Sequence, residues 1–254
     1  MTTTAVTRPV SGRPFAPFHR ADRNAFLIFT AVVWVGILAG FGGDVRQHVA
    51  KHGLDYPLIV HVHAAAFVSW LILFTVQVFL IRLHRPDIHM KLGLAMLGLA
   101  AFMVVIGPAT AIYMDHRVLG KPDADTTFVA IQLLDIVAFA GFVIAAAVWR
   151  ARPSIHKRMM LMSLIFISDA GFARWLAPTV APMIHDPFWS DLAADYLAND
   201  VLFLAFGAYD LATRGRLHPA YVGGLVWALG LQLLATALHL SPAFKPIALK
   251  LVGG

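Results

Sequence analysis

The residues of this chain best suited to chemistry are histidines and a glutamine inside one hydrophobic run. The run extends from Pro57 to Arg82 and contains His61, His63 and Gln77. About 20 apolar residues span the hydrocarbon core of a bilayer. Polar side chains are costly there, so each of these three is a candidate functional residue. Imidazole can ligate haem iron or a metal ion and can carry a proton.

Helical geometry separates the two histidines. Residues two positions apart point to opposite sides of an α-helix. The stripe that begins with His63 continues through Phe67, Trp70, Phe74 and Gln77. We expect this stripe to face the protein interior and His61 to face away. An aromatic stripe with polar ends suits a haem or quinone pocket, and it also suits ordinary packing between helices.

Seven hydrophobic segments are the elements that would position these residues. Charged residues make up only 13% of the 254 residues, whereas a soluble domain has about 25%. The segments are Ala25–Phe41, Pro57–Arg82, His89–Met114, Thr127–Trp149, His156–Val180, Asp195–Ala212 and Ala220–Leu240. Backbone polar groups must be paired in lipid, so such segments are predicted to be helices. The sequence therefore predicts an all-α membrane protein: a polar N-terminal tail (1–24), a bundle of seven transmembrane helices (25–240) and a short C-terminal tail (241–254).

The basic residues predict the orientation of these segments. Thirteen Lys and Arg residues fall on one predicted side of the membrane and six on the other. The positive-inside rule then places the N-terminus in the cytoplasm and the C-terminus outside, in a cell (inner) membrane. We expect the lipid bilayer as partner. Basic residues confined to short loops argue against nucleic acid, and short loops leave no large soluble domain for a partner.

Ionisable side chains concentrate in the predicted outer half of the bilayer. Asp135, Asp169 and Asp200 lie on three helices at depths similar to that of His63, and Arg174 lies close by. The predicted inner half has almost none away from its rim. Two interpretations stay open. In the first, a divalent metal is held by His63, Asp135, Asp169 and Asp200, with Arg174 as counter-ion. Alternatively they form structural pairs, Arg174 with Asp169 or Asp200 and His63 with Asp135.

Two basic turns recur on the predicted cytoplasmic side. Each ends in a histidine that opens the next helix, His89 in RLHRPDIHMKLG and His156 in WRARPSIHKRMM. The basic residues of these turns, Arg158 among them, suit contact with lipid headgroups. The alternative is that His89 and His156 are the axial ligands of a haem.

These residues resemble the pattern of a group of uncharacterised bacterial multi-span membrane proteins with His-Arg turns. The resemblance covers spans two to five, with Met at position 90 where the pattern favours Arg. It is carried by His63, Gln77, Arg82, His89, Gly93, His156-Lys-Arg-Met-Met, Ser163 and Arg174-Trp. It implies that His63, Gln77, His89, His156 and Arg174 act as a set, and it implies no particular reaction.

Three functions remain open, and whether the protein is an enzyme is left undecided. The first is electron transfer by a b-type haem bound through intramembrane histidines, with His89 and His156, or His63 with His116 or His239, as ligands. The second is proton- or cation-coupled transport, or an accessory role, through Asp135, Asp169 and Asp200. The third is a metal-dependent membrane hydrolase. The supply of twelve histidines favours haem or metal binding.

Absent residues limit these choices. Without cysteine there is no disulfide, iron–sulfur cluster or thiolate zinc site. The seventh segment has no lysine for a retinal Schiff base. Seven-helix zinc hydrolases of the ceramidase and adiponectin-receptor type have paired histidines on the last helix, where this chain has only His239.

Overall fold

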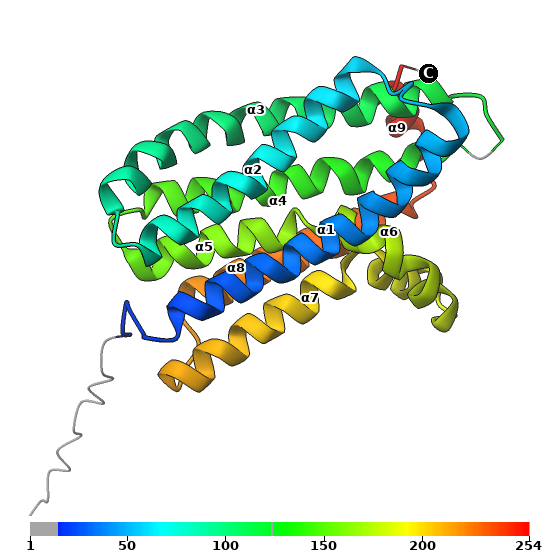
Figure 1. The fold of residues 1–254 in the computed structure, drawn as a ribbon. Helices are drawn as coiled ribbons and strands as arrows, with labels where there is room; N and C mark the ends of the chain where they lie inside the picture. The colour runs from blue at the N-terminus through cyan, green and yellow to red at the C-terminus, as the bar shows by residue number, and fades with distance from the viewer. Residues whose placement is uncertain (1–14, 123, 254) are drawn as a thin grey trace, which may run out of the picture.

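The computed structural model describes residues 15–122 and 124–253, and that part of the chain is helical without strands. The α-helices are α1 (Asp22–His52), α2 (Leu58–Arg82), α3 (Pro86–Val118), α4 (Val129–Val148), α5 (Pro153–Phe166), α6 (Asp169–Val180), α7 (Pro187–Arg214), α8 (Pro219–His239) and α9 (Lys245–Leu251). Two 3-10 turns, η1 (Thr126–Phe128) and η2 (Ala181–Met183), precede α4 and follow α6. The long helices run side by side in an elongated bundle (Figure 1).

The predicted hydrophobic segments coincide with helices, which confirms an all-α, membrane-type fold. In the described residues α1, α2, α3, α8 and the continuous η1–α4 are long and apolar enough to cross a bilayer. The predicted fifth segment is broken: α5 and α6 meet at 46° and together have the length of a sixth span. The predicted sixth segment lies within α7, which begins earlier, at Pro187, and carries four aspartates.

Helix α4 lies at the centre of the bundle. Half of its apolar stretch (50%) is buried, against 22% for α3, because α4 packs on α3, α5 and α8. Trp70 of α2 meets Phe139 of α4 edge-on, with 5.0 Å between ring centroids. The predicted inward stripe of α2 is therefore confirmed: Trp70 and Gln77 are buried, whereas His61 is exposed.

Glycines allow α1 and α6 to pack closely. A Cβ atom on Gly40 would lie 1.9 Å from the carbonyl oxygen of Gly171, and one on Gly36 would lie 2.4 Å from the ring of Phe172. Small residues four apart are expected where helix backbones approach each other. Gly36 and Gly40 therefore allow the backbones of α1 and α6 to approach each other closely.

The two ends of the bundle differ in charge. We call the end where α1 begins, which carries Arg82, Arg150, Arg158 and Arg214, the basic end, and the other the opposite end. Residues 1–14 of the predicted tail lie outside the described residues, but Phe15 packs edge-on against His218 at the basic end, with 4.6 Å between ring centroids. At the opposite end, His116 Nδ1 lies 2.8 Å from the carbonyl oxygen of Val252, just beyond α9.

Candidate functional site

A pair of buried carboxyl groups lies between α4, α6 and α7. Asp135 is 8% exposed and Asp169 is 6% exposed. The two carboxyl groups lie close enough to interact with each other, and two neighbouring buried carboxyl groups are most stable when one of them carries a proton. Tyr196 donates its hydroxyl to Oδ1 of Asp135 at 2.8 Å. We call Asp135 and Asp169 the carboxyl pair.

The break between α5 and α6 positions Asp169. It is the first residue of α6, directly after Ser168, so the carboxyl group lies at a helix N-terminus inside the bundle. A helix break leaves backbone carbonyls without helical partners. The amide of Asn199 on α7 donates to the carbonyl oxygen of Phe166 at 2.9 Å, and Ser168 Oγ donates to the carbonyl oxygen of Ile165 at 2.6 Å. The break is therefore a fixed feature of the packed bundle.

More polar groups lie near the carboxyl pair on α4, α7 and α8. Several of their buried polar atoms have no hydrogen-bond partner in the part of the chain that the structure describes: Gln132 Oε1, Asn199 Oδ1, Asp200 Oδ1, both polar atoms of the Gln232 amide and Thr236 Oγ1. Buried polar groups in proteins are nearly always paired with protein or ordered water. These atoms are thus suited to hydrogen-bond to water molecules inside the bundle.

His63 lies apart from the carboxyl pair. Its ring stacks on Phe67 with 4.2 Å between centroids, and its Nδ1 atom is buried without a hydrogen-bond partner among the described residues. The alternative pairing of His63 with Asp135 is not seen. His63 is therefore a partly buried imidazole on the helix stripe that the sequence predicted.

Arg174 has a different partner from those considered in the sequence. Its Nε atom lies 3.4 Å from Oδ2 of Asp44 on α1, and its guanidinium group lies 4.1 Å from the centroid of the Phe41 ring. It also donates to the carbonyl oxygen of Ala170 at 2.6 Å. The structure thus pairs Arg174 with Asp44 at the opposite end of the bundle rather than with Asp169 or Asp200.

Three of the predicted cofactor-binding residues come together at the basic end. The rings of His89 and His156 lie on α3 and α5 with 6.1 Å between centroids and perpendicular planes. His156 Nδ1 donates to the carbonyl oxygen of Ala146 at 2.9 Å, and Gln77 Nε2 donates to the carbonyl oxygen of His89 at 3.1 Å. His63 is not part of this group, since it precedes Gln77 by 14 residues, about 21 Å along α2.

The donors predicted for a metal ion do not form a metal site. No group of three or more His or Asp side chains within residues 15–122 and 124–253 is arranged to hold a metal ion. A metal held by His63, Asp135, Asp169 and Asp200, and the hydrolase that would use it, therefore remain predictions without a matching set of donors.

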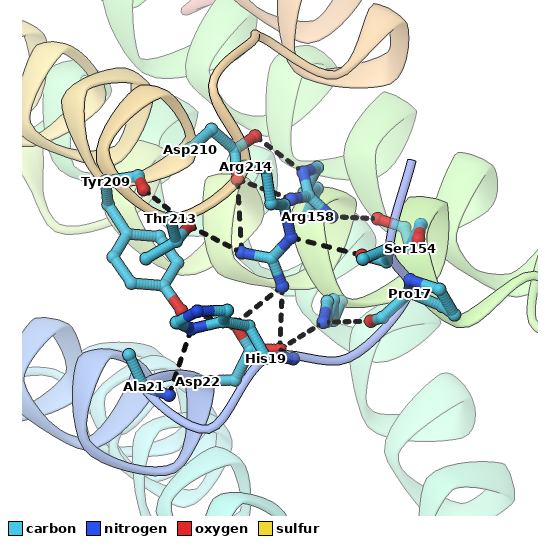
Figure 2. A network of polar contacts seen from close by, with 12 residues as sticks. Pro17, His19, Ala21, Asp22, Ser154, Arg158, Tyr209, Asp210, Thr213 and Arg214 are labelled. Carbon is cyan, nitrogen blue, oxygen red and sulfur yellow. Dashed lines mark hydrogen bonds and ion pairs between the residues drawn. The ribbon is translucent and has the colours of Figure 1, made fainter. Parts of the chain in front are cut away.

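The sequence missed a buried ion cluster at the basic end (Figure 2). Arg158 is 1% exposed and donates from Nε to Asp210 Oδ2 at 2.9 Å, with a second bond to Oδ1. Arg214 joins Asp210 to Asp22, binding the two oxygens of Asp22 at 2.8 and 2.9 Å. Lys157 Nζ contacts Asp22 at 2.7 Å. The expectation that Arg158 contacts lipid headgroups was wrong, because its side chain is buried.

Comparison with known proteins finds no matching family model, no matching curated protein and no matching solved structure. The function must therefore be argued from the geometry of the chain itself.

Proposed function

We propose that this protein is a multi-pass membrane protein that moves protons, alone or coupled to a solute, through the carboxyl pair of Asp135 and Asp169. The observation that carries the proposal is the close approach of these two buried carboxyl groups at a helix break. Buried carboxyl groups within membrane helices are costly and are used as proton relays. Transporters commonly place their binding sites at broken helices.

The depth of the carboxyl pair supports this role. Asp135 is 13 residues, about 20 Å, from the end of α4 at the basic end, and Asp169 is 16 residues, about 24 Å, from the start of α5. Both therefore lie in the half of the bundle nearer the opposite end. A proton that enters from the opposite end of the bundle therefore reaches the carboxyl pair before it has crossed most of the bilayer.

We further infer seven crossings, with α7 as the sixth and α8 as the seventh, the basic end in the cytoplasm and the C-terminus outside. The excess of basic residues at the basic end supports this orientation. Helix α7 packs on α6 and α8, and nine uncharged residues separate its Asp200 from its Asp210. A cell (inner) membrane is the location that fits this topology.

Infrared difference spectroscopy tests the shared proton. A shift in pH should change the carbonyl stretching band of a protonated carboxylic acid in the wild-type protein. Asp135→Asn and Asp169→Asn should each remove that change. Asp87→Asn is the control, because Asp87 pairs with Arg85 at 3.0 Å on the surface. A band unchanged in both pair variants would contradict the proposal.

Proton flux tests the movement of that proton. The protein is reconstituted into liposomes with a pH-sensitive dye inside, and a membrane potential is imposed. We expect internal acidification above that of empty liposomes, reduced at least tenfold by Asp169→Asn. Wild-type flux equal to that of empty liposomes would exclude uncoupled proton conduction, whereas the infrared result would still report on proton binding.

A second function, electron transfer through a b-type haem, is favoured by the His89 and His156 pair. His156 Nδ1 is held by a backbone carbonyl, as the distal nitrogen of a ligating histidine usually is, which leaves Nε2 free to ligate. The Nδ1 atom of His89 is buried and unpartnered within the described residues. The side chains of His89 and His156 are therefore suited to a haem. They would be its ligands, and the haem would supply one-electron chemistry.

The visible spectrum of the purified protein tests this second function. A Soret band that is lost in His156→Ala and retained in His63→Ala would support it, because His63 lies far from the pair. No Soret band in protein expressed with an adequate haem supply would overturn it.

A further inference from the structure

A groove opens beside the ion cluster at the basic end. It has a volume of about 870 Å³ and lies between the ends of α4, α5 and α8, with Phe15 at its margin. Its mouth holds three polar side chains, Arg152, Arg216 and His218. The remaining lining is apolar or glycine.

The groove changes from basic to apolar along its length. Arg152 and Arg216 are exposed where the helices end, and the guanidinium of Arg216 lies 5.7 Å from the centroid of the Phe15 ring. Trp227 lies eight residues after Pro219 on α8, about 12 Å deeper along the helix. Trp149 and Trp227 are 43% and 42% exposed although both are large aromatic residues. Tryptophan is enriched where membrane proteins meet the headgroup region.

Glycines give the groove its space. A Cβ on Gly141 would lie 2.8 Å from Nε1 of Trp227, so the indole lies directly against the backbone of α4. A Cβ on Gly223 would meet no described atom within 4 Å, although Gly223 lines the groove. The absence of a side chain at Gly223 leaves open space in the apolar part of the groove, into which an acyl chain could extend.

We propose that this groove binds one anionic phospholipid from the bilayer, with its phosphate between Arg152 and Arg216 and an acyl chain along Gly223 towards Trp227. The charges are complementary, since arginines bind phosphate oxygens through several donors. Basic pockets between membrane helices bind anionic headgroups in this way. A small soluble anion would leave the apolar part of the groove unused. This inference does not depend on proton transport by the carboxyl pair.

Native mass spectrometry of the purified protein in mild detergent tests the headgroup. The probes are phosphatidylglycerol, phosphatidylcholine of the same acyl chains, and inorganic phosphate. We expect the first phosphatidylglycerol to bind about tenfold more tightly than phosphatidylcholine, and Arg152→Gln with Arg216→Gln to abolish this preference. Arg150→Gln is the matched control, because Arg150 is an exposed arginine of the same turn that does not line the groove.

Filling the groove tests the acyl chain. Gly223→Leu places a side chain in the open groove and should reduce binding of the first lipid at least tenfold. Gly230→Leu is the control, since Gly230 is an exposed glycine of the same helix, also with open space at its Cβ, outside the groove. Equal binding of both phospholipids, unchanged preference in the double arginine variant, unchanged binding in Gly223→Leu, or displacement by inorganic phosphate at equimolar concentration would each overturn the proposal.

Discussion

Tyr196 on α7 donates its hydroxyl to Oδ1 of Asp135 on α4 across 2.8 Å, and both side chains are buried. This bond joins two helices at the carboxyl pair. It supplies a fixed donor for one oxygen of Asp135, while Asp169 occupies the neighbouring position at the helix break. The bond therefore fixes the position of the Asp135 carboxyl group between α4 and α7.

Replacing Tyr196 by Phe should destabilise the protein by about 1–3 kcal/mol, because a buried oxygen of Asp135 loses its donor. Thermal unfolding in detergent measures the effect. Tyr113→Phe is the control, since Tyr113 is 43% exposed. Equal melting temperatures for the Tyr196→Phe and wild-type proteins would mean that the bond contributes nothing to stability.

The helices of this fold could be predicted because hydropathy alone marks them. Each predicted segment overlaps a helix, and the inward stripe from Trp70 to Gln77 followed from helical periodicity. The break near Ser168 could not be predicted, because only two polar residues, Ser168 and Asp169, interrupt the apolar run there and no proline marks the site. The full length of α7 was missed because its first turns carry polar residues.

The candidate site was predictable only as a set of positions. Asp135 and Asp169 stand out as carboxyl groups in apolar segments, but their pairing and the role of Tyr196 depend on how three helices rotate against each other. Arg158 was assigned to lipid contact because basic residues near helix ends usually reach the surface. Asp210, a carboxyl group inside the predicted sixth segment, is the feature that could have indicated a buried partner.

Gly40→Ala should destabilise the protein strongly, because the new Cβ would lie 1.9 Å from the backbone oxygen of Gly171. Backbone cannot move aside as a flexible side chain can, so α1 and α6 would have to separate. Gly43→Ala is the matched control: its Cβ would meet no described atom within 4 Å. Alanine is also the better helix former, so the control should be neutral or stabilising by up to about 1 kcal/mol. Equal unfolding midpoints for the two variants would contradict the close approach of α1 and α6.

Arg158 and Asp210 should show strong coupling in a double-mutant cycle. Removing one partner leaves the other charge buried, so Arg158→Met and Asp210→Leu should each cost about 3–5 kcal/mol. The double variant should cost clearly less than the sum, because it leaves neither of the two charges unpaired. Chemical unfolding in detergent measures the four free energies. Additive losses would show that the two side chains do not interact in the folded protein.

His218 should make stability depend on pH. Burial beside Arg158 lowers the pKa of His218 to about 4, and its Nδ1 accepts a hydrogen bond from the backbone N–H of Ala220 at 3.0 Å. An unfolded histidine has a pKa of about 6.5, so below that pH the unfolded chain binds a proton that the folded protein does not. The stabilisation is therefore complete above pH 6.5, declines as the pH falls, and is lost near pH 4.

His218→Asn isolates this contribution, since asparagine can cap α8 in the same way but does not titrate. Unfolding free energies measured from pH 7 to pH 4.5 should fall further in the wild type than in His218→Asn, by about 1–3 kcal/mol. His61→Asn, at an exposed position, should follow the wild-type curve. Parallel curves for the wild type and His218→Asn would show that His218 takes up its proton equally well in the folded and unfolded protein.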